Sequence, residues 1–187
     1  LILRRFNQLP EPTQRLLEVA SVCGETFGTV PLAAGLQEDL ETTEDRCTQL
    51  LRPGSLIIDL NPVVWPDGSV CERYRFQHAL YRQVIHDHLG HARRARLHRR
   101  LALCMEAGYG DRVAEIAGEL ALHFQQAQDP GQAMKYCLLA AQTAMMRHAP
   151  QEILTHGRVG LGLLAKLPRT TQRNSAELDT LILLGTA

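Results

Sequence analysis

Residues 56–78 read LIIDLNPVVWPDGSVCERYRFQH, and this stretch decides the fold class. Residues 56–60 are apolar except for Asp59 and are a strand candidate, and residues 72–77 alternate aromatic with polar side chains, as strands with one buried face do. Between them, residues 61–62 and 66–68 contain the Asn-Pro and Pro-Asp-Gly combinations that favour tight turns. The stretch therefore predicts a β-hairpin.

Three helices are predicted before this hairpin. Residues 10–23 carry apolar side chains at helical spacing and are followed by Gly24, which ends the helix; residues 31–35 form a short second helix, and residues 40–51 form a third. Three helices followed by a β-hairpin is the element order of a winged helix-turn-helix. We therefore expect a winged-helix domain over residues 1–91, with a short N-terminal remnant of a preceding domain.

The second half of the chain is predicted to be helical throughout. Short turns join its apolar stripes, and many inward positions are Ala or Gly, which favours antiparallel helices packed closely into a solenoid. The expectation is a mostly α protein in which residues 92–187 form a TPR-like helical repeat segment, truncated at its C-terminus. The stripes expected to face inward are Leu80, Tyr81, Val84, Ile85 and Leu89; Leu97, Leu101, Cys104 and Met105; Val113, Ile116, Ala117, Leu120, Ala121 and Phe124; Ala133, Cys137, Ala140, Ala141 and Ala144; Ile153, Gly157, Leu161 and Leu164; and, in a helix from about Ser175, Leu178, Leu181 and Ile182.

The composition excludes several classes of protein. Apolar residues make up 45% of the chain, charged residues 21%, and the formal net charge is zero, so no global field attracts nucleic acid or an anionic membrane. No apolar run approaches the roughly 20 residues of a membrane span. The five cysteines are odd in number and far apart, which indicates reduced thiols and a cytoplasmic location.

An ordered set of short motifs resembles a known family. The set comprises Leu9-Pro10, Leu16-Leu17, Cys23-Gly24 with Phe27, Leu50-Leu51, Tyr74-x-Phe76-x-His78-x-Leu80, Leu97-His98 with Ala102, and Leu122-His123-Phe124 before Asp129-Pro130. In this order the motifs resemble STAND-type signal-transduction NTPases, above all bacterial regulators and cyclase-linked ATPases of the maltose-regulator type.

The resemblance implies a larger parent protein. In this family a P-loop NTPase domain precedes the winged helix, and a helical-repeat arm that binds a partner or an inducer follows it. Binding at the arm is thought to release an ADP-locked form, which exchanges nucleotide, oligomerises and drives signalling or transcription regulation. The chain itself lacks a P-loop, because its two lysines, Lys135 and Lys166, are followed by Tyr and Leu rather than Ser or Thr. We therefore expect no enzymatic activity from it, with ATP or ADP bound only by the parent.

His78 is the candidate cofactor-binding residue, and the resemblance suggests its role. Related STAND proteins have a Met-His-Asp triplet after the second hairpin strand, and its histidine contacts the β-phosphate of ADP. Here the triplet reads Gln77-His78-Ala79, which keeps the histidine and loses both neighbours. A helix N-terminus and an imidazole both suit a phosphate, so we expect this contact in the full-length protein only. The alternative is a histidine that merely ends the strand.

DNA binding is the main alternative function. A free-standing winged-helix transcriptional regulator would place residues 40–51 in the major groove, N-terminus first. Five acidic residues crowd that end and would repel phosphates, so we expect a protein-contact module and no direct DNA contact. The acidic residues are Glu38, Asp39, Glu41, Glu44 and Asp45.

Three further patterns have simpler explanations. The arginines within residues 91–100 lack interleaved aromatic residues and indicate an exposed face or one that docks on the NTPase domain. His86, His88 and His91 lack metal-ligand spacing, so no metal site is expected. Gly160-x-Gly162 lies in a helical stripe and indicates helix packing. An enzyme with an unrecognised site is a second, disfavoured alternative.

Overall fold

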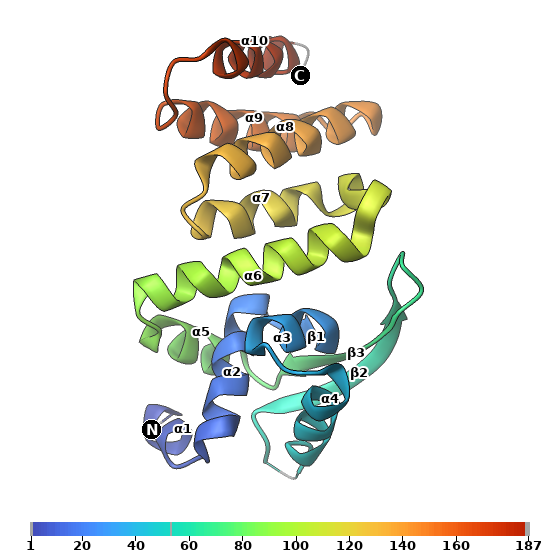
Figure 1. The fold of residues 1–187 in the computed structure, drawn as a ribbon, viewed down its shortest axis with the longest axis vertical. Helices are drawn as coiled ribbons and strands as arrows, with labels where there is room; N and C mark the ends of the chain where they lie inside the picture. Colours follow the sequence, from blue (N-terminus) through green and yellow to red (C-terminus); the bar gives the residue numbers. More distant parts are fainter. Residues whose placement is uncertain (1, 53, 186–187) are drawn as a thin grey trace. The chain divides into compact units, whose positions relative to one another are not determined.

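A computed structural model describes residues 2–52 and 54–185 (Figure 1). The chain divides into two compact units. The units are Leu1–Gly108 and Tyr109–Ala187. The described residues are mostly helical and include one small antiparallel sheet of three strands. We expected the domain boundary between residues 91 and 92. A long helix (His91–Tyr109) begins there, and all of it except its last residue belongs to the first unit.

The first unit alternates helices with short strands (Figure 1). Two of its helices begin with residues that favour a helix start. Pro12 lies in the first turn of the second helix, and Asp39 caps the fourth helix by accepting a hydrogen bond from the Thr42 amide at 2.8 Å. Its elements are α1 (Ile2–Asn7), α2 (Glu11–Cys23), β1 (Thr26–Gly28), α3 (Thr29–Leu36), α4 (Leu40–Gln49), β2 (Ile57–Val64), β3 (Val70–Phe76), α5 (Ala79–His88) and α6 (His91–Tyr109).

The predicted hairpin is present and gains a third strand. β2 pairs antiparallel with β3, with Ile57 opposite Phe76 and an irregularity between Leu60 and Val63. The sheet order is β1-β3-β2, so β3 lies in the centre. Strand β1 was not predicted, because three residues carry no periodicity and their hydrogen bonds come from β3, far along the chain.

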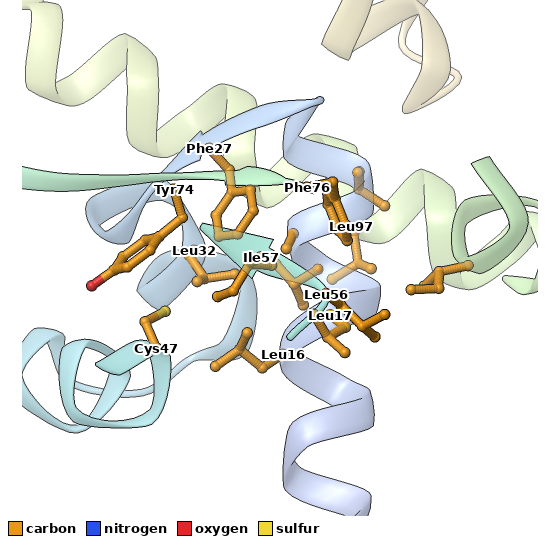
Figure 2. Packing of buried hydrophobic residues seen from close by; sticks show 14 of the residues in the cluster. Leu16, Leu17, Phe27, Leu32, Cys47, Leu56, Ile57, Tyr74, Phe76 and Leu97 are labelled. Carbon is orange, nitrogen blue, oxygen red and sulfur yellow. The ribbon is translucent and has the colours of Figure 1, made fainter. Parts of the chain in front are cut away.

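Side chains of the sheet and of the helices meet in one core (Figure 2). Phe27 from β1 lies 5.5 Å from Phe76 of β3, measured between ring centroids, and both rings are buried. Leu16 of α2 and Leu97 of α6 belong to the same cluster. A Cβ on Gly108, near the end of α6, would lie 2.5 Å from Cζ3 of Trp65, so only glycine lets the tryptophan ring approach there.

The second unit is a stack of consecutive helices. Asp129 caps the helix α8 (Pro130–Met146) by accepting from the Gln132 amide at 3.1 Å, and buried alanines line one face of this helix. The buried rings of Phe124 and Tyr136 stack with centroids 5.5 Å apart, joining two of the helices. The elements are η1 (Gly110–Ile116, a 3-10 helix), α7 (Ala117–Gln126), α8 (Pro130–Met146), α9 (Pro150–Leu164) and α10 (Thr171–Gly185).

Two expectations for this unit were wrong in detail. The stripe from Val113 to Phe124 does not form one α-helix, since its first part is the 3-10 segment η1, where Val113 and Ile116 are only half-buried. The last helix begins at Thr171 rather than near Ser175. A 3-10 turn has three residues per turn, so side chains of the expected stripe leave the shared face.

The inward face of α10 also differs from the expected one. Leu178, Leu181 and Ile182 are 59%, 52% and 56% exposed, whereas Thr180 and Leu183 are buried. A Cβ on Gly157 of α9 would lie 2.6 Å from Cδ2 of Leu184, so Leu184 occupies the space that glycine leaves. This contact orients α10 so that Leu178, Leu181 and Ile182 point outward.

None of the helices in the described part of the chain combines the length and the apolar character required to cross a membrane.

Candidate functional site

His78 lies at the junction between β3 and α5. It is the N-cap residue of α5, with extended backbone angles (φ −139°, ψ 135°), and its side chain makes no capping hydrogen bond. Its backbone oxygen accepts from the Tyr81 amide at 2.9 Å, and the two rings lie 5.3 Å apart. The side chain is exposed on the surface of the first unit. The imidazole is therefore accessible to a partner.

Backbone and side-chain hydrogen bonds hold this junction firmly. The Phe76 amide donates to the Glu25 backbone oxygen at 3.0 Å, and the Gln77 amide donates to the Leu56 backbone oxygen at 2.9 Å. On α5, Arg82 Nε donates to the backbone oxygen of Ser21 at 3.0 Å and ties the helix to α2. The position of His78 is thus fixed by elements on both sides of it.

The junction has the chemistry to accept an anion. The first amides of an α-helix have no partner within the helix and carry partial positive charge. His78 adds an imidazole donor at the same end, and its neighbours Gln77, Ala79 and Leu80 are all exposed. The expectation that Leu80 faces inward was therefore wrong, since its side chain is 57% exposed at the start of α5. These residues fit a phosphate contact of the kind that the resemblance implies. With Ala79 after it, the histidine lacks the carboxylate of the family triplet.

The acidic residues of the expected recognition helix lie on or beside α4. Glu38 pairs with Arg46, with an oxygen-to-nitrogen distance of 2.6 Å, so this arginine is already neutralised. Hydrogen bonds from the amide and hydroxyl of Thr42 lower the pKa of Asp39. Glu41 and Asp45 are exposed. The exposed surface at this end of α4 is therefore negative.

The three histidines around residues 86–91 have separate surroundings. His86 Nδ1 lies 3.4 Å from both Asp87 and Arg94, and burial lowers its pKa. His88 meets the ring of Phe6, whereas His91 contacts Arg94 at 2.9 Å. Within residues 2–52 and 54–185, no group of three or more His, Cys, Asp or Glu side chains is arranged to hold a metal ion.

The second unit contains an open cavity of about 720 Å³ that sequence reasoning missed. It lies between the first turns of α8, the loop after α9, and α10. Met134 and Leu138 give it apolar walls, while Lys135, Arg173 and Asp179 bring both signs of charge. Its volume falls in the range of small-molecule and peptide sites. No local motif marks it, because its residues come from three separate segments.

One wall of this cavity contains an unsatisfied polar atom. Gln132 Oε1 is buried without a hydrogen-bond partner, and Arg173 is held by Glu177 at 2.5 Å. Buried carbonyl oxygens normally accept a hydrogen bond from protein or water. The wall is therefore a place where a ligand donor, or an ordered water, would complete the hydrogen bonding.

Comparison with known proteins returned no relatives: no protein-family model matches the chain, and neither a curated protein nor a solved structure matches it.

Proposed function

We propose that the chain is the winged-helix and TPR-like region of a STAND-type signal-transduction ATPase, acting as a regulatory and interaction segment. The order α2-β1-α3-α4-β2-β3 and the central position of β3 support a winged helix. The consecutive packed helices α7 to α10 support a TPR-like arm. The parent protein would be cytoplasmic and bacterial, would bind ATP and ADP in an upstream NTPase domain, and would regulate transcription or another effector.

The observation that carries this proposal is the exposure of His78 at the N-cap of α5. A histidine buried away from any surface could not contact a nucleotide held by another domain. An exposed imidazole beside a helix N-terminus can donate to a phosphate, and loss of that phosphate would release the winged helix. In this proposal the histidine links nucleotide state to domain position.

The helical arm would bind a protein partner or a small-molecule inducer. The cavity beside α8 and α10 supports this role, because it combines apolar walls with both signs of charge. The negative surface of α4 supports protein contact rather than DNA contact by the winged helix, since phosphate neutralisation supplies most DNA affinity.

The test uses the full-length parent protein with His78→Ala. We expect faster release of bound ADP and higher basal signalling, because the ADP-held state loses a contact. His91→Ala is the matched control, since it removes another exposed histidine from a helix start in the same unit. Unchanged ADP retention and unchanged basal signalling in His78→Ala would refute the assignment.

A further inference from the structure

Three arginines form a stripe along one face of α6. Arg93, Arg96 and Arg100 are spaced by three and four residues, so their side chains share a face of the helix. Together with Arg15 of α2, they line a cavity of about 380 Å³ within the first unit. Leu97 and Val19 add apolar wall, and among the residues that the structure describes no acidic one lines the cavity.

Local structure accounts for only part of this positive charge. Arg93 Nη2 lies 2.5 Å from Glu18 Oε2, a charge contact that lacks hydrogen-bond geometry. Arg100 Nη1 donates to the backbone oxygen of Gly35 at 3.2 Å, near the C-terminal end of α3. Arg15 pairs with Glu11 at 2.9 Å on an exposed surface, where such a pair is weak.

Arg96 is the arginine that these contacts leave unexplained. Its side chain is exposed in the open cavity and makes no ion pair or hydrogen bond with the residues that the structure describes. The four guanidiniums of the cavity are offset by two carboxylates, Glu11 and Glu18, which leaves two positive charges. Like charges on one helix face repel each other weakly, so an anion in the cavity would stabilise the cluster.

We propose that this arginine cavity binds a ligand that carries a phosphate group. A phosphate monoester brings about −1.5 to −2 charges and three acceptor oxygens at neutral pH, which matches the two uncompensated charges of the arginines that line the cavity. A carboxylate brings one charge and two oxygens, so it would leave one of the two positive charges uncompensated. The site is separate from His78 and does not depend on the proposed nucleotide-sensing role.

The phosphate group can come from free phosphate or from a phosphorylated peptide, and the test distinguishes these two sources. Inorganic phosphate and a phosphoserine peptide are titrated into the 187-residue chain by calorimetry, and arginine side-chain NMR signals locate the site. We expect saturable one-to-one binding. The dissociation constants of inorganic phosphate and of the phosphoserine peptide are compared, and the lower one identifies the source of the phosphate group. Arg96→Gln should weaken this binding by about tenfold, as expected for a lost charge-assisted hydrogen bond.

Arg158→Gln is the matched control. Arg158 is exposed on α9, so its replacement removes the same charge from a helix without touching the cavity. Equal weakening by Arg96→Gln and Arg158→Gln would show attraction by overall charge and would overturn the proposal. Absence of saturation at millimolar phosphate and phosphopeptide would overturn it too. A peptide with glutamate in place of phosphoserine that binds as tightly would overturn the phosphate assignment, and thermal unfolding of each variant verifies folding.

Discussion

Gly35 of α3 lies directly against Val19 of α2, with no room between them for another carbon atom. A Cβ built on Gly35 would overlap Cγ1 of Val19, and Cδ2 of Leu101 would lie 3.5 Å away. Both Gly35 and Val19 are buried. The approach of α3 to α2 therefore depends on a glycine at this position.

Gly35→Ala should lower the free energy of unfolding by about 1–3 kcal/mol, because the added methyl overpacks the core. Urea unfolding followed by circular dichroism measures the change. The double variant with Val19→Ala should recover part of the loss, since the two residues are in contact. Gly162→Ala on α9 meets nothing within 4 Å, so it should be neutral or stabilising by up to about 1 kcal/mol. A Gly35→Ala protein as stable as the wild type would contradict this packing.

The second unit should lose stability in mild acid through His123. This side chain is 4% exposed, and desolvation lowers its pKa to about 4 from 6.5. Between these two values the unfolded chain binds more protons than the folded one, so stability is full above pH 6.5 and falls as the pH drops towards 4. The loss should reach about 3 kcal/mol.

Hydrogen exchange of α7 and α8 between pH 4 and 7 provides the measurement, after correction for the intrinsic exchange rate. His123→Leu should remove most of this pH dependence. Gln126→Leu introduces the same residue at an exposed position of the same helix and should retain it. An identical pH profile in wild type and His123→Leu would rule out this origin.

Two buried cysteines should resist alkylation in the folded protein. Burial raises the pKa of Cys47 to about 12 and that of Cys137 to about 11, and both side chains are at most 1% exposed. Because the thiolate is the nucleophile, their reaction with iodoacetamide at pH 8 should be more than about a hundredfold slower than in urea. Half-buried Cys23 serves as the comparison within the chain. Mass spectrometry reads each site, and rapid labelling of Cys47 would disprove the described core.

The negative end of α4 should prevent DNA binding by the first unit. A gel-shift titration at several salt concentrations should show no steeply salt-dependent complex with the wild-type chain. The double variant Glu41→Lys and Asp45→Lys reverses two exposed charges and should introduce weak, salt-sensitive binding. Tight DNA binding by the wild type would instead favour the free-standing transcriptional regulator.

Local sequence signals predicted the elements that are stabilised locally. Turn residues and alternation identified the hairpin of β2 and β3, and Pro and Gly identified the start and end of α2. Position 78 was predicted between strand and helix, where it lies, although its role remains a prediction. The short strand β1 was not predicted, because its partner strand β3 is about fifty residues away in the sequence.

Long-range packing also decided what the sequence did not reveal. The orientation of α10 depends on Leu184 meeting Gly157, a contact between different helices. The arginine cavity depends on α2 and α6 lying together, so a run of five arginines could not by itself distinguish Arg96 from its neighbours. Periodicity describes one helix at a time, and these features belong to pairs of helices.

The contact between Trp65 and Gly108 gives the protein an intrinsic optical reporter. The chain has a single tryptophan, and its ring is shielded from water where the hairpin meets the last turn of α6. Separation of those two segments would hydrate the indole and move its emission to longer wavelength. Fluorescence of the unlabelled protein can therefore follow the integrity of the first unit.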